Sequence, residues 1–342
     1  TSLCWHLANV CLVYRFFIML LSKSNVYIEY NIRIIAFFTA LLWGIHPVNV
    51  ESVAWLSASK VLIYTFFYLL SLLCYLKYVQ NRRNTYFLLT LFFFICSFLG
   101  KEQAVTLPVC LLLIDYFVGR DFHNRELWVE KISFLSLSLL GGILTILSQG
   151  SEGEELIYSL DYRILFACYT TFEYMVKSFL PVNLSYIYPF PVLPEESIPL
   201  RLWFYPIIVL TGSGMLFVYR KNKIVMFSIL FLVLHVAVAL HLISISRFTI
   251  VADRYLYLGC IGTSFLTVWI FFHFIQALSE KWKRLLISAC FALYLIYLGT
   301  YCFSYTKDWK DTDTLKSHVR KLIKNRENSS PLKKHGEPFN NN

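Results

Sequence analysis

Charged side chains stand beside long apolar stretches at three separated places in this chain. The segments are WGIHPVNVESVAW, GKEQ and VADRYLY. Their chemistry-bearing residues are His46, Glu51, Lys101, Glu102, Asp253 and Arg254. Lys and Arg bind phosphate oxygens, Arg through a planar fork, while carboxylates hold polar groups or transfer protons. If the fold brings these groups together, they form a site for a lipid-linked phosphate.

Each of these residues also has a purely structural explanation. Pro47 suits the first turn of a helix, with Glu51 in the turn that follows. Glu102 at a helix start is favoured by the helix dipole. Arg254 could extend toward water and pair with Asp253. Lys177 joins the same face of the membrane, and surface anchoring is the alternative role for it.

The composition indicates whether water or lipid surrounds the elements that must position these groups. Of the 342 residues, 57% are hydrophobic and only 15% are charged, which is typical of a membrane protein and excludes a soluble domain. A helix needs roughly 20 apolar residues to cross about 30 Å of hydrocarbon. Long apolar runs exclude the two-residue period of a membrane β-barrel. We therefore predict an all-α integral membrane protein, a polytopic helical bundle.

Apolar runs between charged breaks predict ten transmembrane helices and one interfacial helix. The ten segments are 4–21, 33–46, 61–78, 84–99, 103–119, 132–149, 203–219, 224–243, 255–274 and 285–303. Residues 161–180 are apolar but carry four charges, which predicts an amphipathic helix lying in the interface. Residues 1–303 would form the membrane domain, and residues 304–342 a soluble tail on the outer or luminal side.

The distribution of basic residues predicts the orientation. With the N-terminus outside, one set of loops holds fourteen Lys and Arg residues and the opposite set holds seven, so the first set is expected in the cytoplasm. The formal charge of +10 then comes mainly from these loops and the basic tail, which excludes a nucleic-acid partner. The segment 161–180 must not span for this balance to hold.

Several other functions lack their motifs. The nine cysteines have no CxxC spacing, so neither a zinc site nor a disulfide framework is indicated, and no cofactor is predicted. HExxH, P-loop, GxGxxG and GxSxG motifs are absent. The tripeptide Asp253-Arg254-Tyr255 also occurs in G-protein-coupled receptors, but ten spans and an outer position reject that reading. A transporter would show broken helices and repeated halves, which the sequence does not.

Five segments together resemble a known family. They are WHLANVCLVYRF, LLWGIHPVNVESVAWLSASKVLIYTFFYLLSLLCYLKY, LGKEQAVTLPVCLLLIDYF, SFLPVNLSYIYPFP and VADRYLYLGCIG. In this order they resemble the membrane part of the TMTC-type glycosyltransferases and their bacterial TPR-containing relatives. The resemblance covers most of residues 1–315.

The resemblance implies a GT-C fold and the transfer of a sugar from a polyprenyl-phosphate donor to a protein on the outer or luminal side. In the eukaryotic members this is protein O-mannosylation, with TPR repeats after the last span. It implies that Lys101 and Arg254 bind the donor phosphate and that His46, Glu51, Glu102 and Asp253 line the pocket. The catalytic acidic residue is expected upstream of Thr1, which makes the sequence an internal fragment, and residues 304–342 could begin a truncated TPR region.

Two readings stay open at the level of sequence. One is this glycosyltransferase, and the other is a membrane scaffold or transporter that keeps the fold without catalysis. The expected partners are membrane lipid, a polyprenyl- or dolichyl-phosphate sugar and a protein acceptor. The expected location is the plasma membrane for a bacterial chain and the endoplasmic reticulum membrane for a eukaryotic one. Neither the sugar, the acceptor nor a need for a divalent metal can be read from the sequence.

Overall fold

The computed structural model describes residues 1–24, 26, 30–149, 158–192, 198–240, 249–311, 313–315, 317 and 320. Within these residues every regular element is a helix, and the extended chain contributes one isolated β-bridge between Tyr188 and Val251. The longer helices are α1 (Ser2–Lys23), α2 (Ile32–Gly44), α4 (Ser59–Asn81), α5 (Asn84–Gly100), α6 (Leu107–Val118), α7 (Arg125–Gln149), α8 (Leu160–Phe179), α9 (Phe204–Val218), α10 (Lys223–Val236), α11 (Leu256–Ala277) and α12 (Lys281–Asp308). An all-α architecture is therefore confirmed.

Helix α11 is the central element of the bundle. The spanning part of α11 is 61% buried, and it packs against α2, α8 and α10. Its contact with α10 depends on Gly262, where a Cβ atom would collide with the carbonyl oxygen of Ser228. The absence of a side chain at this position lets the two helix backbones approach closely.

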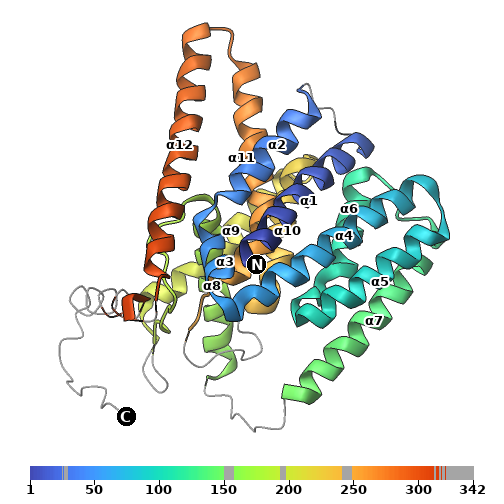
Figure 1. The fold of residues 1–342 in the computed structure, drawn as a ribbon, viewed down its shortest axis with the longest axis horizontal. Helices are drawn as coiled ribbons and strands as arrows, with labels where there is room; N and C mark the ends of the chain where they lie inside the picture. Colours follow the sequence, from blue (N-terminus) through green and yellow to red (C-terminus); the bar gives the residue numbers. More distant parts are fainter. Residues whose placement is uncertain are drawn as a thin grey trace.

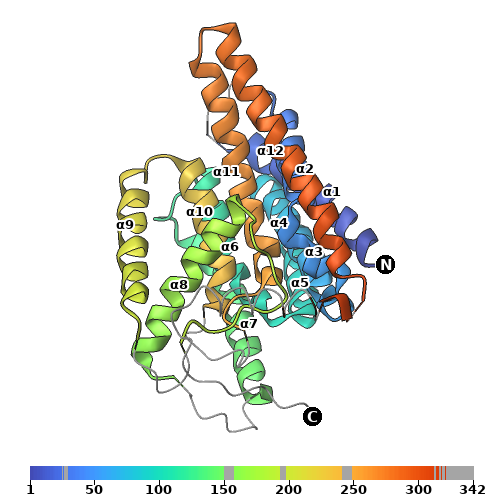
Figure 2. The same ribbon diagram turned by 90° about the vertical axis from the view of Figure 1, so that its left-hand side faces the viewer.

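Two helices lie at the edge of the bundle and expose apolar side chains. The spanning part of α9 is only 6% buried, and that of α12 is 11% buried. Figure 2 shows α9 standing along one side of the molecule, while α11 and α12 form a hairpin that projects at one end. A helix that exposes apolar residues on nearly all sides in a membrane protein faces lipid.

Short helical turns interrupt the chain where the motifs of the sequence lie. After α2 the chain bends by 54° into η1 (Pro47–Asn49) and α3 (Val50–Ala54). The chain then passes through η2 (Leu56–Ala58) into α4, η3 (Glu102–Thr106) joins α5 to α6, and η6 (Asp253–Tyr255) opens α11. Pro47 and Pro108 occupy first-turn positions, where a missing backbone N–H costs nothing.

The predicted count of ten spans is not confirmed. Six described helical stretches are long and apolar enough to cross a membrane, or seven if the bent pair α2 and Pro47–Ala54 is one span. Helices α5 and α10 are apolar but shorter, and α6 has only 12 residues because the first part of its apolar run forms η3. The apolar helices identify a multi-pass membrane protein.

The predicted interfacial helix and the predicted tail differ in how far the structure describes them. Residues predicted as the interfacial helix 161–180 form α8, which packs on α9 and α11. Helix α12 continues to Asp308, five residues beyond the predicted domain boundary at residue 303. Most of the predicted tail, including any TPR-like segment, lies outside the described residues, as does the part of the 224–243 segment after Leu240.

Candidate functional site

Side chains from four segments meet at one end of the bundle. Glu51 comes from α3, Lys101 from the junction of α5 and η3, Lys177 from the end of α8, and Asp253 with Arg254 from η6. We call these five residues the Arg254 cluster. The elements meet because α3 packs on η6 and because α8 and η1 both pack on α11. In Figure 1, α3 and α8 lie away from the tip of the hairpin that α11 and α12 form. Asp253 interacts electrostatically with Glu51, Lys177 and Arg254, which ties the cluster together.

Arg254 is held by Glu51 through two contacts. Its Nη1 lies 2.6 Å from Glu51 Oε1, and its backbone N–H donates to Glu51 Oε2 over 2.8 Å. The Glu51 side chain is fully buried, whereas 19% of the Arg254 side chain is exposed. The guanidinium lies over the rings of Trp55 and Tyr255, 5.4 and 5.2 Å from their centroids. Because a guanidinium has five N–H donors, this fixed group retains donors for an anion.

Lys101 supplies a second cation at the same end. It follows Gly100, where a Cβ atom would come within 3.1 Å of the Tyr64 backbone, so the glycine lets α5 end close against α4. The Lys101 ammonium lies 4.8 Å from the centroid of the Tyr255 ring, and the residue is 5% exposed. Burial lowers the pKa of Lys101 from 10.5 to about 8, with Glu102 opposing the shift and Arg254 adding to it.

Asp253 is buried with one carboxylate oxygen unpaired. Its Oδ1 accepts a hydrogen bond of 2.8 Å from the Tyr188 hydroxyl, and its Oδ2 has no hydrogen-bond partner among the described residues. Lys177 lies over the Tyr188 ring, 4.6 Å from the centroid, and pairs with Glu173 at 3.5 Å. A buried carboxylate oxygen without a partner is costly, so Oδ2 is suited to accept a hydrogen bond from a hydroxyl or amide group of a ligand.

The loop that carries Tyr188 is attached to α12. The hydroxyls of Tyr294 and Tyr297 donate to the carbonyls of Phe179 and Pro181, and the hydroxyl of Tyr301 accepts from the Leu184 N–H. The backbone of Tyr188 in turn bonds to the 249–251 segment that precedes η6. The three tyrosines of α12 therefore set the position of the loop that contacts Asp253.

His46 and Glu102 occupy the periphery of this arrangement. His46 is fully buried, accepts the Val48 N–H at the start of η1 and lies beside the backbone of Ser178. This is the geometry of a helix-capping residue. Glu102 is half-buried and begins η3 next to Lys101. The pocket roles expected for these two residues stay predictions, as do the phosphate-binding roles of Lys101 and Arg254.

A second group of charges, missed by the sequence reasoning, lies at the opposite end of α4 and α5. Tyr75 donates to both oxygens of Asp115, at 2.7 and 2.8 Å, and Lys131 pairs with Asp115 at 2.7 Å. Arg120 bridges Asp115 and Glu130 at 3.2 and 2.8 Å. We call these five residues the Lys131 network. Its signal in the sequence was Asp115 inside the apolar run LLLIDYF, since a buried aspartate requires a cationic partner.

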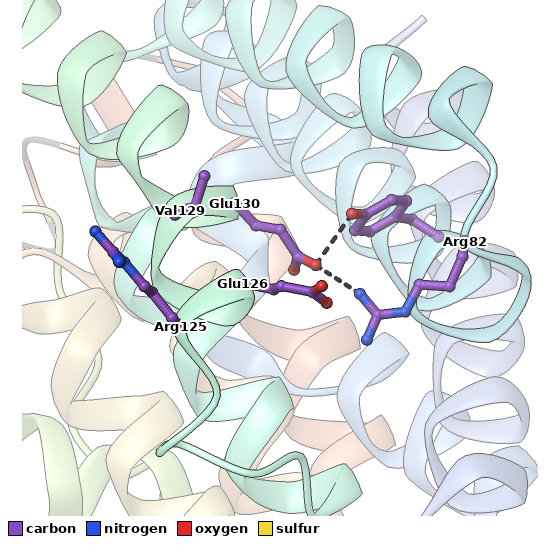
Figure 3. A pocket seen from close by; sticks show the side chains of 6 residues that line it. Arg82, Arg125, Glu126, Val129 and Glu130 are labelled. Atoms are coloured by element: carbon purple, nitrogen blue, oxygen red, sulfur yellow. Dashed lines mark hydrogen bonds and ion pairs between the residues drawn. The ribbon is translucent and has the colours of Figure 1, made fainter.

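The Lys131 network closes one side of a pocket of about 570 Å³. The residues that line the pocket are Tyr78, Arg82, Arg125, Glu126, Val129 and Glu130. Glu130 accepts from the Tyr78 hydroxyl at 3.0 Å and from Arg82 Nη1 at 2.6 Å (Figure 3). Arg82, Arg125 and Lys131 belong to the fourteen basic residues of the loops expected in the cytoplasm, but Lys131 is fully buried.

Several curated proteins match parts of this chain. Protein O-mannosyl-transferase TMTC2 of Mus musculus is 33% identical over 116 residues, which cover 32% of this chain and 14% of the mouse protein. The Homo sapiens protein of the same name is 30% identical over 121 residues, which cover 34% of this chain and 14% of that protein. Protein O-mannosyl-transferase F38B6.6 of Caenorhabditis elegans is 29% identical over 160 residues, covering 45% of this chain and 22% of the relative.

The matched part of this chain thus spans about a seventh to a fifth of the length of these relatives. No protein-family profile matches the chain, and no solved structure matches it. The relatives support a TMTC-like relationship over part of the chain and a glycosyltransferase function at the level of the family.

Proposed function

We propose that this chain is the membrane core of a glycosyltransferase that moves a hexosyl group, mannosyl by analogy with its relatives, from a polyprenyl-phosphate donor to a protein. The observation that carries the proposal is the Arg254 cluster, which places three cations and two buried carboxylates at one end of a lipid-embedded bundle. Chemistry at this end would take place on the outer face of a bacterial plasma membrane or in the lumen of the endoplasmic reticulum.

Arg254 and Lys101 are the donor-phosphate ligands in this proposal. Arg254 is fixed by Glu51 and by the aromatic rings beneath it, so little conformational entropy is lost when a phosphate oxygen binds. Lys101 adds a compact charge beside it. The polyprenyl chain would lie along the apolar helices that expose their side chains to lipid.

The reaction requires a base, an electrophilic carbon and a stabilised leaving group. An acceptor hydroxyl attacks the anomeric carbon while the base takes its proton, the carbon–oxygen bond to phosphate breaks, and the phosphate leaves with the bonding electron pair. Arg254 and Lys101 stabilise the charge that develops on that phosphate. Asp253 Oδ2, His46 and Glu102 would hold sugar or acceptor groups, and Glu51 positions Arg254. The base is assigned to none of the described residues.

Binding of a polyprenyl-phosphate-linked mannose to the purified protein tests this proposal. Arg254→Gln is expected to weaken binding about tenfold or more, because a charge-assisted hydrogen bond contributes about 1.5–3 kcal/mol. Arg254→Lys should restore only part of the affinity, since lysine lacks the planar fork. Lys60→Gln removes an exposed cation at the start of α4 near Lys101 and should leave binding unchanged.

Loss of Arg254 also leaves Glu51 buried without its partner, which by itself destabilises the protein. The double variant Glu51→Gln/Arg254→Gln removes both charges and keeps a neutral pair of similar shape. If this folded double variant binds the donor as tightly as the wild type, the phosphate assignment is wrong and a non-catalytic scaffold is favoured.

A further inference from the structure

The pocket beside the Lys131 network lies far from the Arg254 cluster. Helix α5 begins at Asn84, two residues after Arg82, and ends at Gly100, next to Lys101. Its 17 residues at about 1.5 Å each separate the two ends by roughly 25 Å. The pocket is therefore not a part of the donor site, and its charges take no part in the proposed transfer reaction.

The pocket has both signs of charge in its lining and a rigid wall. Arg82 and Arg125 stand against Glu126 and Glu130, so the lining has no net formal charge. Glu130 is fixed by Arg82, Arg120 and Tyr78. In Figure 3, Glu126 and Glu130 point toward Arg82, and Arg125 stands on the far side of Glu126. In the described part of the chain, Arg125 and Glu126 are exposed and form no ion pair with other residues, so both are available to a ligand.

The backbone conformation of Arg82 also contributes to the rigid wall of the pocket. Arg82 ends α4 with a φ of 52° and ψ of 25°, the left-handed region that glycine and asparagine usually occupy. For other residues this conformation costs roughly 1–2 kcal/mol. Here it directs the arginine over the Tyr78 ring, 5.8 Å from the centroid, and onto Glu130. The strained residue thus forms the wall of the pocket.

The apolar surface that starts at the pocket indicates a lipid. Helix α7 leaves the pocket with Trp128, Val129 and Ile132 exposed at 46%, 56% and 59%. Beside it α5 exposes further apolar side chains, and the two helices are joined through the contacts of Phe134 with Phe87 and Phe94. A charged pocket at the top of two lipid-facing helices lies at headgroup depth.

We propose that the Arg125–Glu126 pocket binds the headgroup of an aminophospholipid of the phosphoethanolamine type. Arg125 binds the lipid phosphate, and Glu126 accepts hydrogen bonds from the primary ammonium group. Arg82, held by Glu130, closes the far side, while the acyl chains lie on the exposed faces of α5 and α7. Phosphatidylglycerol fits less well, because its anionic headgroup offers no cation to Glu126. A choline headgroup is cationic but has no N–H to donate.

Native mass spectrometry of the detergent-purified protein with lipids of identical acyl chains tests the proposal. We expect phosphatidylethanolamine to be retained several-fold more than phosphatidylcholine or phosphatidylglycerol. Glu126→Gln should abolish the preference for ethanolamine over choline, and Arg125→Gln should weaken the binding of both lipids. Neither side chain is buried or ion-paired within the described residues, so both variants should fold.

Glu280→Gln is the matched control. Glu280 lies at the start of the apolar helix α12, as Glu126 lies at the start of α7, and it pairs with an exposed Lys283 at 2.6 Å, but it lies outside the pocket. This variant should keep the ethanolamine preference. The proposal fails if phosphatidylglycerol is retained best, if Glu126→Gln keeps the full preference for ethanolamine, or if Glu280→Gln abolishes that preference as Glu126→Gln does. Free phosphoethanolamine without acyl chains should compete only weakly, and strong competition would identify a soluble ligand in place of a lipid.

Discussion

At the scale of one residue, Lys101 predicts a pH dependence for the proposed donor site. Its pKa of about 8 means that the ammonium form, which binds phosphate, is lost as the pH rises through this value. Mannosyl phosphodiesters keep a constant charge in this range. We therefore expect donor affinity to fall above pH 8, by up to tenfold per pH unit, in a binding titration from pH 6.5 to 10.

Two variants separate Lys101 from other causes of this fall. Lys101→Arg stays protonated and should hold its affinity to pH 10. Lys60→Gln removes a neighbouring positive charge that helps to lower the pKa of Lys101, so it should move the fall to higher pH. A fall that persists in Lys101→Arg would assign the titration to another group.

The lowered pKa of Lys101 affects the stability of the fold in the opposite direction to donor affinity. Between pH 8 and 10.5 the unfolded lysine binds a proton that the folded one has released, so this group makes stability rise with pH.

The buried pair of Lys131 and Asp115 should dominate the stability of its end of the bundle. Both side chains are fully buried, so Lys131→Met leaves Asp115 with only Arg120 and Tyr75 as partners. Breaking a buried ion pair costs about 3–5 kcal/mol, and we expect a clear fall in the midpoint of thermal unfolding measured by circular dichroism in detergent.

Lys283→Met is the exposed counterpart of this variant. Its pair with Glu280 has side chains that are 39% and 46% exposed, so the cost should be about 0–1 kcal/mol. The double variant Asp115→Asn/Lys131→Met should recover much of the stability lost in Lys131→Met. Equal unfolding midpoints for Lys131→Met and Lys283→Met would contradict the buried pair.

At the scale of elements, the packing of α10 against α11 depends on one glycine. Gly262→Ala places a methyl group against the Ser228 carbonyl, so the two central helices must separate. We expect a loss of about 1–3 kcal/mol of stability, read as a lower thermal midpoint. Gly299→Ala on α12 meets no atom within 4 Å and should be neutral or stabilising by up to about 1 kcal/mol. Two equal effects would show that helix propensity, and not contact, decides the outcome at Gly262.

The sequence predicted the helical type of the elements but did not predict where the helices bend. Apolar length predicted helices throughout, because hydrocarbon leaves the backbone few other ways to satisfy its hydrogen bonds. Apolar length did not predict where the helices bend. Pro47 is compatible with a straight helix start or with the observed bend of 54°, and contacts with neighbouring elements determine which of the two forms. For the same reason the apolar run from 103 to 119 divides into η3 and the short α6.

At the scale of the whole molecule, the partners of charged residues were the part that the sequence could not predict. The sequence predicted that the charges of the Arg254 cluster lie at one membrane face, because they flank the ends of apolar runs. The pairing of Arg254 with Glu51, 203 positions away in the chain, depends on how α3 packs against η6. The sequence counted Lys131 among the basic residues of the cytoplasmic loops because a lysine near a helix start is usually exposed, whereas tertiary packing buries this one.

The tyrosines of α12 connect the proposed donor site to the surrounding bilayer. Helix α12 faces lipid along most of its length, yet Tyr294, Tyr297 and Tyr301 fix the loop whose Tyr188 contacts Asp253. A helix exposed to lipid tilts to match the thickness of the hydrocarbon. Through this linkage a change in tilt would move Tyr188 against Asp253, so that the thickness of the membrane becomes a control on the geometry of the site.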